Sequence, residues 1–456
     1  LLFVLLLTAT LIPLTAFSAV DPYSNKTAEE MLVDMGIGWN LGNTLEACGD
    51  WINGKTVRDY ETAWGNIITT QSIIDGIKEA GFRTVRIPVA WSNLMEQDYT
   101  INQGLLERVR EVVDYCSNSG LYAIVNIHWD GGWFENFATD YDESMRKYRL
   151  IWTQVSNYFK DYPNNLIFES LNEEGCWDNI WNRYSGDTGQ NKVRAYNILN
   201  DMNQEFVDIV RASKGKNATR CLLIAGYATD IDLTCDDCFR MPQDNISKKL
   251  MISVHYYTPS TFTILSEDAS WGKSARTWGT AAEINQVTTD FQKMKRKFRD
   301  KGVPVIIGEY STVLQNKEHE SVVRYISTVC EVAYDMGFCP VFWDNGEYYS
   351  REQKRFRDPD VADIFLEYKD DIKVTPTPVE PTPSPGNILK GDLDGDGVID
   401  SMDLVYMKKY LLKTVNDFPS ADGKYAADLD ANGSVDSMDL TILKRYLLKI
   451  ITDFPS

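Results

Sequence analysis

Two glutamates, Glu173 and Glu309, each stand at or just after the end of a short apolar run, where a carboxylate is partly removed from water. Burial raises the pKa of such a group unless a neighbouring charge or hydrogen bond compensates. Two carboxylic acids in different surroundings can therefore divide their work, one protonated as an acid and the other ionised as a nucleophile. This is the chemistry that cleaves a glycosidic bond with retention of configuration, and it predicts carboxyl groups roughly 5 to 5.5 Å apart.

Further polar and aromatic residues also stand at the ends of apolar runs. They are Asn40, Arg86, His128, Asn172, His255, Tyr257 and Trp343. The runs themselves are apolar, as VPVIIG before Glu309 and LIF before Glu169 illustrate. If the runs are strands of a parallel barrel, their ends meet at one face and line a pocket there. Glu169 and Glu174 are alternatives to Glu173, but only Glu173 directly follows an asparagine.

Eight short apolar or β-branched runs predict strands. They span residues 36–40, 84–88, 122–128, 166–173, 221–227, 251–257, 303–310 and 339–344. Longer segments between them repeat apolar residues at helical spacing, for example 105–116, 148–162 and 193–211. Alternating strands and helices predict an α/β fold with a parallel sheet covered by helices. Eight strands, without a glycine-rich phosphate turn after the first, favour a closed (β/α)₈ TIM barrel over an open doubly wound sheet.

Two near-identical segments follow, DLDGDGVIDSMD from Asp392 to Asp403 and DLDANGSVDSMD from Asp428 to Asp439. Each places side-chain oxygens at loop positions 1, 3, 5, 9 and 12 and glycine at position 6, as a Ca²⁺ loop requires. Each is followed by a similar tail, KKYLLKTVNDFPS or KRYLLKIITDFPS, so the unit is duplicated. The predicted ligands are Asp392, Asp394, Asp396, Asp400 and Asp403 with the carbonyl of Val398, and Asp428, Asp430, Asn432, Asp436 and Asp439 with the carbonyl of Ser434. Two structural Ca²⁺ ions are therefore expected, whereas the glutamate chemistry needs no cofactor.

The chain of 456 residues, 43% of them apolar, is long enough for more than one domain. Residues 1–19 are apolar, end in small residues and predict a secretory signal peptide whose basic start precedes the given sequence. Proline recurs at nearly every second or third position of residues 374–387, which predicts an extended linker. The linker separates a large barrel domain, residues 20–373, from the duplicated domain, residues 388–456.

The formal net charge of −20 argues against nucleic acid as a partner, because basic groups are needed to neutralise phosphates. Part of this charge lies in the predicted calcium loops, where bound ions would cancel it. Apart from residues 1–19, no segment approaches the length of a membrane span, so a membrane is not an expected partner either.

Eight cysteines are scattered along the chain and permit disulfides in an exported protein, but their spacing assigns no pairs. Cys235 and Cys238 have CxxC spacing without a second CxxC. A local disulfide or free thiols are therefore favoured over a zinc site.

Most of the twelve tryptophans are candidates for the core, and Trp152, within a helical pattern, is the plainest example. Others lie in polar or glycine-containing stretches after predicted strands, where flat rings can stack on sugar rings. These are Trp51, Trp133, Trp177, Trp181, Trp271 and Trp278. His319, in the charged stretch NKEHES, is expected on the surface.

Seven motifs occur in order along the barrel domain: GIGWNLGNTLEA, GFRTVRIPVAW, IVNIHWDGGW, LIFESLNEEG, VHYYTP, VIIGEYS and FWDNG. Together they resemble glycoside hydrolase family 5, the cellulase family. The resemblance implies that Glu173 is the general acid/base and Glu309 the nucleophile. The substrate-binding set, with Arg86 and Tyr257 also holding Glu309 ionised, would be Asn40, Arg86, His128, Asn172, His255, Tyr257 and Trp343. In that set Asn172 would bind the sugar 2-hydroxyl, and Trp343 would stack under the ring.

The duplicated domain resembles a type I dockerin, the small, all-α calcium-binding module that joins secreted enzymes to a cohesin on a bacterial scaffold. The resemblance implies that the pairs Ser401–Met402 and Ser437–Met438 contact cohesin. An extracellular protein of a cellulosome, from an anaerobic bacterium, is therefore expected.

The expected function is a secreted, cellulosomal, retaining endo-β-1,4-glucanase acting on cellulose or related β-glucans of plant cell walls. Glu174 follows Glu173 where proline is usual, and Trp129 follows His128 where many relatives carry a second histidine. These departures leave the preferred polysaccharide open, so xyloglucanase, mannanase and xylanase activities are alternatives. A non-catalytic carbohydrate-binding subunit is an alternative of a different class, disfavoured because both glutamates are present.

Overall fold

The computed structural model describes residues 21–370, 389–415, 417–420, 423–430 and 434–454. The predicted signal peptide, residues 1–19, and the predicted linker, residues 374–387, lie outside the described residues.

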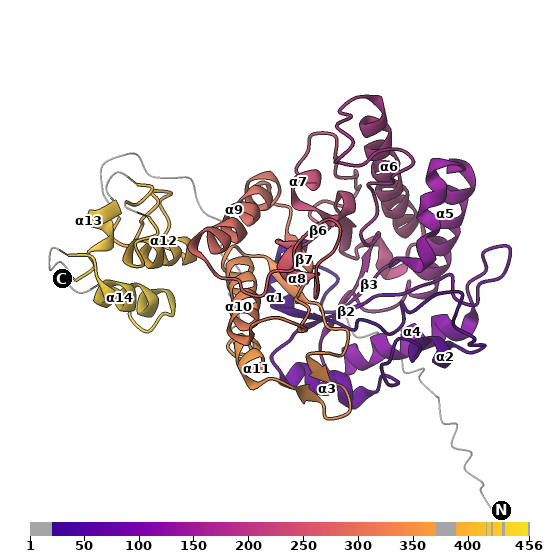
Figure 1. Cartoon of the computed structure of the whole chain (residues 1–456), viewed down its shortest axis with the longest axis horizontal. Coiled ribbons are helices and arrows are strands. Elements are labelled where there is room, and N and C mark those ends of the chain that lie inside the picture. The colour runs from indigo at the N-terminus through magenta and orange to yellow at the C-terminus, as the bar shows by residue number, and fades with distance from the viewer. Residues whose placement is uncertain (1–20, 371–388, 416, 421–422, 431–433, 455–456) are drawn as a thin grey trace, which may run out of the picture.

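Eight parallel strands close a barrel in chain order, with β8 paired to β1 (Figure 1). The strands are β1 (Gly38–Asn40), β2 (Thr84–Ile87), β3 (Tyr122–Val125), β4 (Leu166–Glu169), β5 (Leu222–Ala225), β6 (Leu250–His255), β7 (Val305–Tyr310) and β8 (Cys339–Phe342). A two-stranded antiparallel sheet, β9 (Tyr349–Ser350) and β10 (Arg355–Phe356), follows β8. The predicted (β/α)₈ barrel is confirmed. Several strands end earlier than predicted, so some of the expected strand-end residues lie in the loops that follow.

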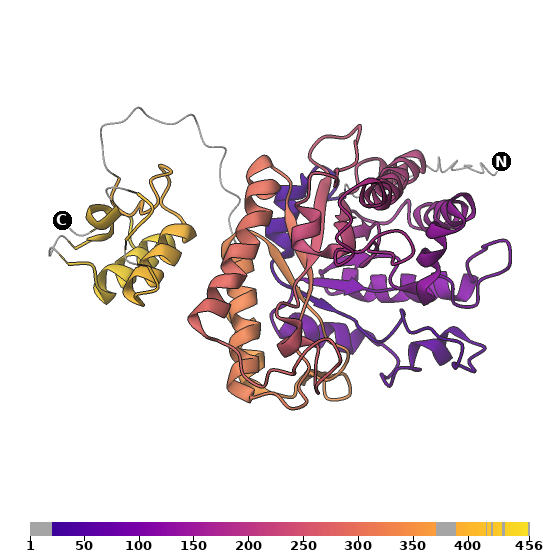
Figure 2. The same ribbon diagram turned by 45° about the horizontal axis from the view of Figure 1, so that its top comes forward.

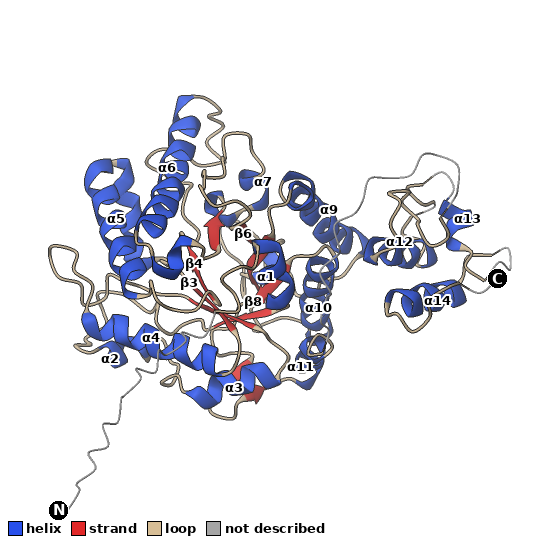
Figure 3. Ribbon diagram, turned by 180° about the vertical axis from the view of Figure 1, so that it is seen from behind, coloured by secondary structure: helices blue, strands red, loops and turns tan. Residues whose placement is uncertain are grey.

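Helices surround the barrel and complete the domain (Figure 3). They are α1 (Ala28–Met35), α2 (Val57–Glu61), α3 (Gln71–Glu79), α4 (Gln103–Asn118), α5 (Tyr141–Tyr158), α6 (Gln190–Ala212), α7 (Ile231–Thr234), α8 (Ser260–Thr263), α9 (Ala281–Lys297), α10 (His319–Asp335) and α11 (Pro359–Leu366), with 3₁₀ segments η1 (Asp130–Ala138), η2 (Gly215–Ala218), η3 (Tyr227–Thr229) and η4 (Arg299–Lys301). The predicted segments 105–116 and 193–211 fall inside α4 and α6. The segment 148–162 overlaps α5 but misses its start, where Asp140 caps the helix by accepting a hydrogen bond from the Glu143 amide.

The barrel is closed at one end by α1. Met31, Leu32 and Met35 of this helix pack against side chains inside the barrel, such as Ile167 and Ile306. Burial of these apolar groups removes water from the lower barrel. The barrel interior can therefore open to solvent only at the carboxyl ends of the strands, where the predicted site residues lie.

A second, smaller group of helices follows the predicted linker: α12 (Ser401–Leu411), α13 (Gly423–Ala427) and α14 (Ser437–Leu447). Their own core contains Leu393, Met407, Leu429 and Leu443, which come from both copies of the duplication. Figure 2 shows these helices beside the barrel, and Figure 1, in which they are labelled, shows α12 nearest to it. Among the described residues, none of the helices combines the length and the apolar character needed to cross a membrane.

Candidate active site

Strand alternation determines which polar side chains enter the barrel. Side chains two residues apart on a strand face the same side. Thr84 points inward, because its hydroxyl donates to the Met35 carbonyl of α1 at 2.9 Å, so Arg86 does too. Ile167 belongs to the interior cluster, and Glu169 follows it on the same face. The upper layer of the barrel is therefore polar and charged.

Arg86 is the centre of this layer and is fully buried. Its guanidinium binds two carboxylates, with Nη1 at 2.7 Å from Glu309 and Nε at 2.7 Å from Glu169. Nη1 also donates to the Asn40 side-chain oxygen at 3.0 Å, and Nη2 to that of Asn172 at 2.8 Å. Burial opposes the charge on Arg86, but the two glutamates more than offset it, so the net effect raises the pKa of Arg86.

Glu309, at the end of β7, lies next to the polar side chains of Arg86, Tyr257 and His255. Arg86 holds one carboxylate oxygen, and the Tyr257 hydroxyl donates to the other at 3.0 Å. His255 Nδ1 lies 3.7 Å from that second oxygen. The net effect raises the pKa of Glu309, because burial is the largest cause; Arg86, and His255 when it is protonated, act in the opposite direction. The direct contacts with Arg86 and Tyr257 favour the ionised form.

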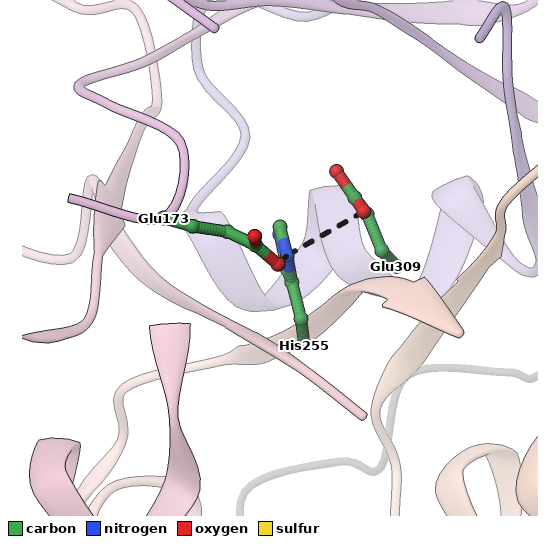
Figure 4. A group of neighbouring side chains, drawn as sticks. All are labelled: Glu173, His255 and Glu309. Atoms are coloured by element: carbon green, nitrogen blue, oxygen red, sulfur yellow. Dashed lines mark hydrogen bonds and ion pairs between the residues drawn. The ribbon is translucent and has the colours of Figure 1, made fainter. Parts of the chain in front are cut away.

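Glu173 lies in the loop after β4 and faces Glu309 across His255 (Figure 4). Its carboxyl contacts His255 Nδ1 at 2.7 Å, and its side chain is 49% exposed at the open end of the barrel. One ligand atom each of Glu173, His255 and Glu309 lie within 4.8 Å of one another. Burial by surrounding protein atoms raises the pKa of Glu173, with Arg86 opposing it. Unlike Glu309, Glu173 has no direct contact with Arg86 among the hydrogen bonds of the described residues.

His255 is held neutral near pH 7, since burial lowers its pKa to about 4. A neutral imidazole carries a proton on one nitrogen and accepts at the other. The 2.7 Å contact with Glu173 can therefore be satisfied in both protonation states of the carboxyl. When Glu173 is protonated it donates to Nδ1, and when it is ionised Nδ1–H donates to it.

His128 and Trp343 stack against each other. Their rings are nearly parallel, at an interplanar angle of 5° with centroids 5.7 Å apart. Burial, with the nearby charge of Arg86, holds the pKa of His128 well below its usual value. A neutral histidine and an indole are suited to a neutral sugar rather than to a charged ligand.

Some predicted residues occupy different positions from those expected. Asn40 is fully buried, and its amide nitrogen donates to the Gly308 carbonyl at 2.9 Å. It therefore positions Arg86 and does not face a substrate, contrary to the prediction. Arg86 is also inaccessible and acts through Glu309 and Asn172. The Asn172 oxygen is occupied by Arg86, which leaves its amide nitrogen as the group that can donate to a ligand.

Some of the predictions for the tryptophans and for His319 are confirmed, and others are wrong. Trp152 is in the core and His319 is exposed, as expected. Trp51 and Trp271 are exposed on loops after strands, and Trp133 is half-buried. Trp177, Trp181 and Trp278 are buried within the main core, so their proposed role as stacking platforms is wrong. Glycine-containing loops can fold back over a core, and sequence context does not distinguish these cases.

Glu169 is the residue of this site that was not assigned a role from the sequence. It is fully buried and pairs with Arg86. The two-residue period of a strand could have predicted its position. Glu169 lies two positions after Ile167, as Arg86 lies two positions after Thr84, so both side chains face the inside of the barrel.

The predicted calcium loops bring hard oxygen donors together. Carboxylate oxygens of Asp392, Asp394 and Asp403 lie within 4.8 Å of one another, and so do those of Asp428, Asp430 and Asp439 in the second copy. Gly397, at loop position 6, has φ +87°, the left-handed geometry for which glycine is needed. Burial and the neighbouring charge of Asp396 raise the pKa of Asp394, which a bound cation would reverse. This donor set fits Ca²⁺.

The remaining predicted ligands are not gathered in the same groups. Asp400 and Asp436 cap α12 and α14, where their carboxylates accept the amides of Met402 and Met438 at 2.7 Å. Asp396 accepts the amide of Val398 at 2.8 Å. Asn432 lies outside the described residues, and the roles of Val398 and Ser434 stay predictions.

All eight cysteines, each of which the structure describes, are free thiols. This includes Cys235 and Cys238, for which a local disulfide was one of the two favoured alternatives.

A closed (β/α)₈ barrel with two close carboxylates at the carboxyl ends of its strands is the arrangement that a retaining glycoside hydrolase requires. The chain matches the cellulase family, glycosyl hydrolase family 5, over residues 46–349, and it belongs to that family. Glycosyl hydrolase family 5 is a retaining family. Residues 390–448 match the type I dockerin domain, a calcium-binding module that binds cohesin.

Similar proteins are endoglucanases. The chain is 36% identical over 363 residues to Endoglucanase A of Paenibacillus barcinonensis, covering 73% of this chain and 86% of the relative. It is 34% identical over 329 residues to Endoglucanase A of Clostridium longisporum, covering 72% of this chain but only 61% of that relative. A solved structure described as a "GH5-4 broad specificity endoglucanase" from an uncultured bovine rumen ciliate has a TM-score of 0.68 at 35% identity, covering 75% of this chain and 98% of its own.

We expect Glu169→Gln to move the acid limb of the kcat/KM profile to lower pH. In the wild-type protein Arg86 forms ion pairs with both Glu169 and Glu309. In the variant the neutral glutamine no longer competes for the charge of Arg86, so Arg86 stabilises ionised Glu309 more strongly and lowers its pKa. The shift should be about one pH unit, and loss of half of a buried pair should lower the free energy of unfolding by about 3 kcal/mol.

The matched control is Glu61→Gln, which removes the buried partner of Arg108 away from the site. It should also lose stability but leave the acid limb in place. Measurement of kcat/KM from pH 3 to 8, with chemical denaturation, distinguishes the two variants. An acid limb that moves to higher pH in Glu169→Gln would contradict the assigned charge sharing.

Proposed function

We propose that this chain is a secreted, cellulosomal endo-β-1,4-glucanase that acts with retention of configuration. The observation that carries the proposal is the pair of carboxyl groups, Glu173 and Glu309, whose oxygens lie within 4.8 Å of each other at the open end of the barrel. This separation favours the close carboxyl spacing of a retaining enzyme, roughly 5 to 5.5 Å, over the wider spacing that an inverting enzyme needs to place its attacking water.

In the first step Glu309 attacks the anomeric carbon of a β-linked sugar. Glu173 gives its proton to the bridging oxygen, so the bond between anomeric carbon and oxygen breaks as the bond to Glu309 forms. Arg86 and Tyr257 keep Glu309 ionised and fix its two oxygens. Glu173 lacks such contacts with a cation, so it is the group that retains its proton.

In the second step Glu173, now ionised, takes a proton from water as the water attacks the anomeric carbon and releases Glu309. His255 stays beside the carboxyl in both steps, with Nδ1 2.7 Å from Glu173. Asn172, oriented by Arg86, has its amide free to bind the sugar 2-hydroxyl, and Trp343 is positioned to stack on the ring.

An internal cleavage of a long chain is supported by the surface around the site. Exposed Trp51, Trp129 and Trp271 all lie on loops that follow strands and can stack on further sugar units. A polar hollow of about 320 Å³ adjoins the loop after Trp343 and is lined by residues such as Asn43, Trp64 and Asn345. The same two glutamates serve xyloglucan, mannan and xylan hydrolysis, so these remain alternative substrates. A non-catalytic binding subunit is disfavoured by the intact contacts of Glu309.

The dockerin supports the location proposed for the enzyme. We propose that its two loops each bind one structural Ca²⁺ and that Ser401–Met402 and Ser437–Met438 contact cohesin, attaching the enzyme to an extracellular scaffold. The apolar residues 1–19, outside the described residues, would direct export.

We expect Glu309→Gln to eliminate turnover of every substrate while the protein stays folded. Glu173→Gln should lower turnover of a glucan by about 10²- to 10⁴-fold. With an aryl glycoside whose leaving group needs no proton, Glu173→Gln should instead complete the first step and accumulate a covalent intermediate, which intact-mass spectrometry detects. Glu174→Gln is the matched neighbouring control. Substantial residual activity in pure Glu309→Gln protein would exclude Glu309 as nucleophile.

Barley glucan and carboxymethylcellulose should release more reducing sugar than xyloglucan, glucomannan or xylan in a direct comparison. Viscosity should fall faster than reducing ends appear, because internal cleavage shortens long chains first. Glu309→Gln protein prepared in parallel gives the background. Preference for xylan or glucomannan would favour the corresponding alternative activity.

Chelation with EDTA should unfold the dockerin and leave the barrel active, since the clustered carboxylates repel one another without a cation. Limited proteolysis with mass spectrometry should show new cleavage between residues 389 and 454 only, and excess Ca²⁺ should restore protection. A dockerin that stays resistant and binds cohesin in EDTA would remove the calcium premise.

A further inference from the structure

The two copies of the dockerin duplication have the same sequence where cohesin contact is proposed. Ser401–Met402 and Ser437–Met438 occupy loop positions 10 and 11 and open α12 and α14. A lysine follows at the same place in both helices, Lys408 and Lys444. From sequence alone the two faces are equivalent binding surfaces.

The structure places them in different surroundings. We propose that the enzyme's own barrel covers the first face, so that cohesin is captured through the second; this rests on the proposed cohesin role of the two pairs. Figures 1 and 3 both show α12 against the barrel beside α9 and α10, with α14 farther away.

Ser401 is engaged by the end of α10. Its hydroxyl donates to the carbonyl of Asp335, the last residue of that helix, at 3.0 Å. The last carbonyls of a helix lack partners within the helix, so an external donor is favourable there. Met402 is half-buried and packs against the main core of the barrel domain. Both members of the first pair are therefore occupied.

An ion pair completes this contact. Lys408 Nζ lies 2.7 Å from Glu331 in the last turns of α10. The last turn of α10 contains no basic residue of its own. Because a helix carries partial negative charge at its carboxyl end, a cation supplied from outside is favourable there. Lys408 supplies it from the dockerin.

The second pair is open to solvent. Met438 is 56% exposed and Ser437 is exposed as well. Met402 packs against the core of the barrel domain, and Met438 is not among the described residues that do so, so contact with the barrel distinguishes the two faces. Exposed ion pairs are weak individually, so the contact biases access to the first face and does not lock it.

Hydroxyl-radical footprinting of the full, calcium-loaded chain tests the covering without any cohesin. Met402 should be oxidised about threefold more slowly than Met438, since oxidation follows exposure. Glu331→Lys should bring the two rates together, and Glu331→Lys with Lys408→Glu should restore the protection. The matched control is Glu107→Lys on α4, an exposed acid on the opposite side of the barrel, which should change nothing. Equal oxidation of Met402 and Met438 in the wild-type chain would overturn the proposal.

The proposed capture of cohesin through the second pair is tested by titrating the full chain with a purified type I cohesin that binds the wild-type protein. Replacing both residues of the second pair by Asp should weaken binding about three- to tenfold more than the same change in the first pair. Asp is compatible with folding there, since both pairs open helices. Adding Glu331→Lys to the chain blocked at the second pair should recover affinity, whereas Glu107→Lys should not.

Equal losses from blocking either pair would overturn the inference while leaving the cohesin role intact. Failure of every type I cohesin tried to bind the calcium-loaded wild-type chain would instead overturn the proposed cohesin role, and the access inference with it.

Discussion

A buried guanidinium is the constraint on which the active site depends. Arg86 is fully removed from solvent, which is tolerated only where anions and acceptors surround it. Glu169 and Glu309 supply the charge, and Asn40 and Asn172 supply the acceptors. These groups come from β1, β4, β7 and the loop after β4, so their contacts with one side chain also fix the relative positions of distant segments. Stability and chemistry thus rest on the same interactions.

The same arrangement gives two chemically identical glutamates different behaviour. Glu309 has Arg86 and Tyr257 on its oxygens, whereas Glu173 has a neutral histidine and partial exposure to solvent. The first environment stabilises a carboxylate, and the second tolerates gain and loss of a proton. His255 links them, since it lies 2.7 Å from Glu173 and 3.7 Å from Glu309. The difference arises from contacts, not from distance to the surface alone.

Much of this could be predicted from sequence because strand periodicity is a local property. The eight strands, their order and the residues at their ends followed from apolar runs, and the position of Glu169 beside Arg86 follows from the same period. Contacts between segments distant in sequence could not be derived in this way. Asn40 was expected to face substrate, but its amide donates to Gly308, far along the chain, and Trp177 was expected in a pocket but packs in the core.

The duplication shows the limit of sequence more sharply. Its two copies share the residues Ser-Met-Asp-Leu and a lysine at the same place, so these contact residues do not tell the two faces apart. They also differ in what lies next to them: α12 lies beside α10, a helix whose last turn contains no basic residue, whereas α14 lies farther away. A repeated unit attached to a single, unrepeated barrel meets an asymmetric surface. Symmetry of sequence therefore persists inside the dockerin, in its shared core and its paired caps, and is lost at its contact with the enzyme.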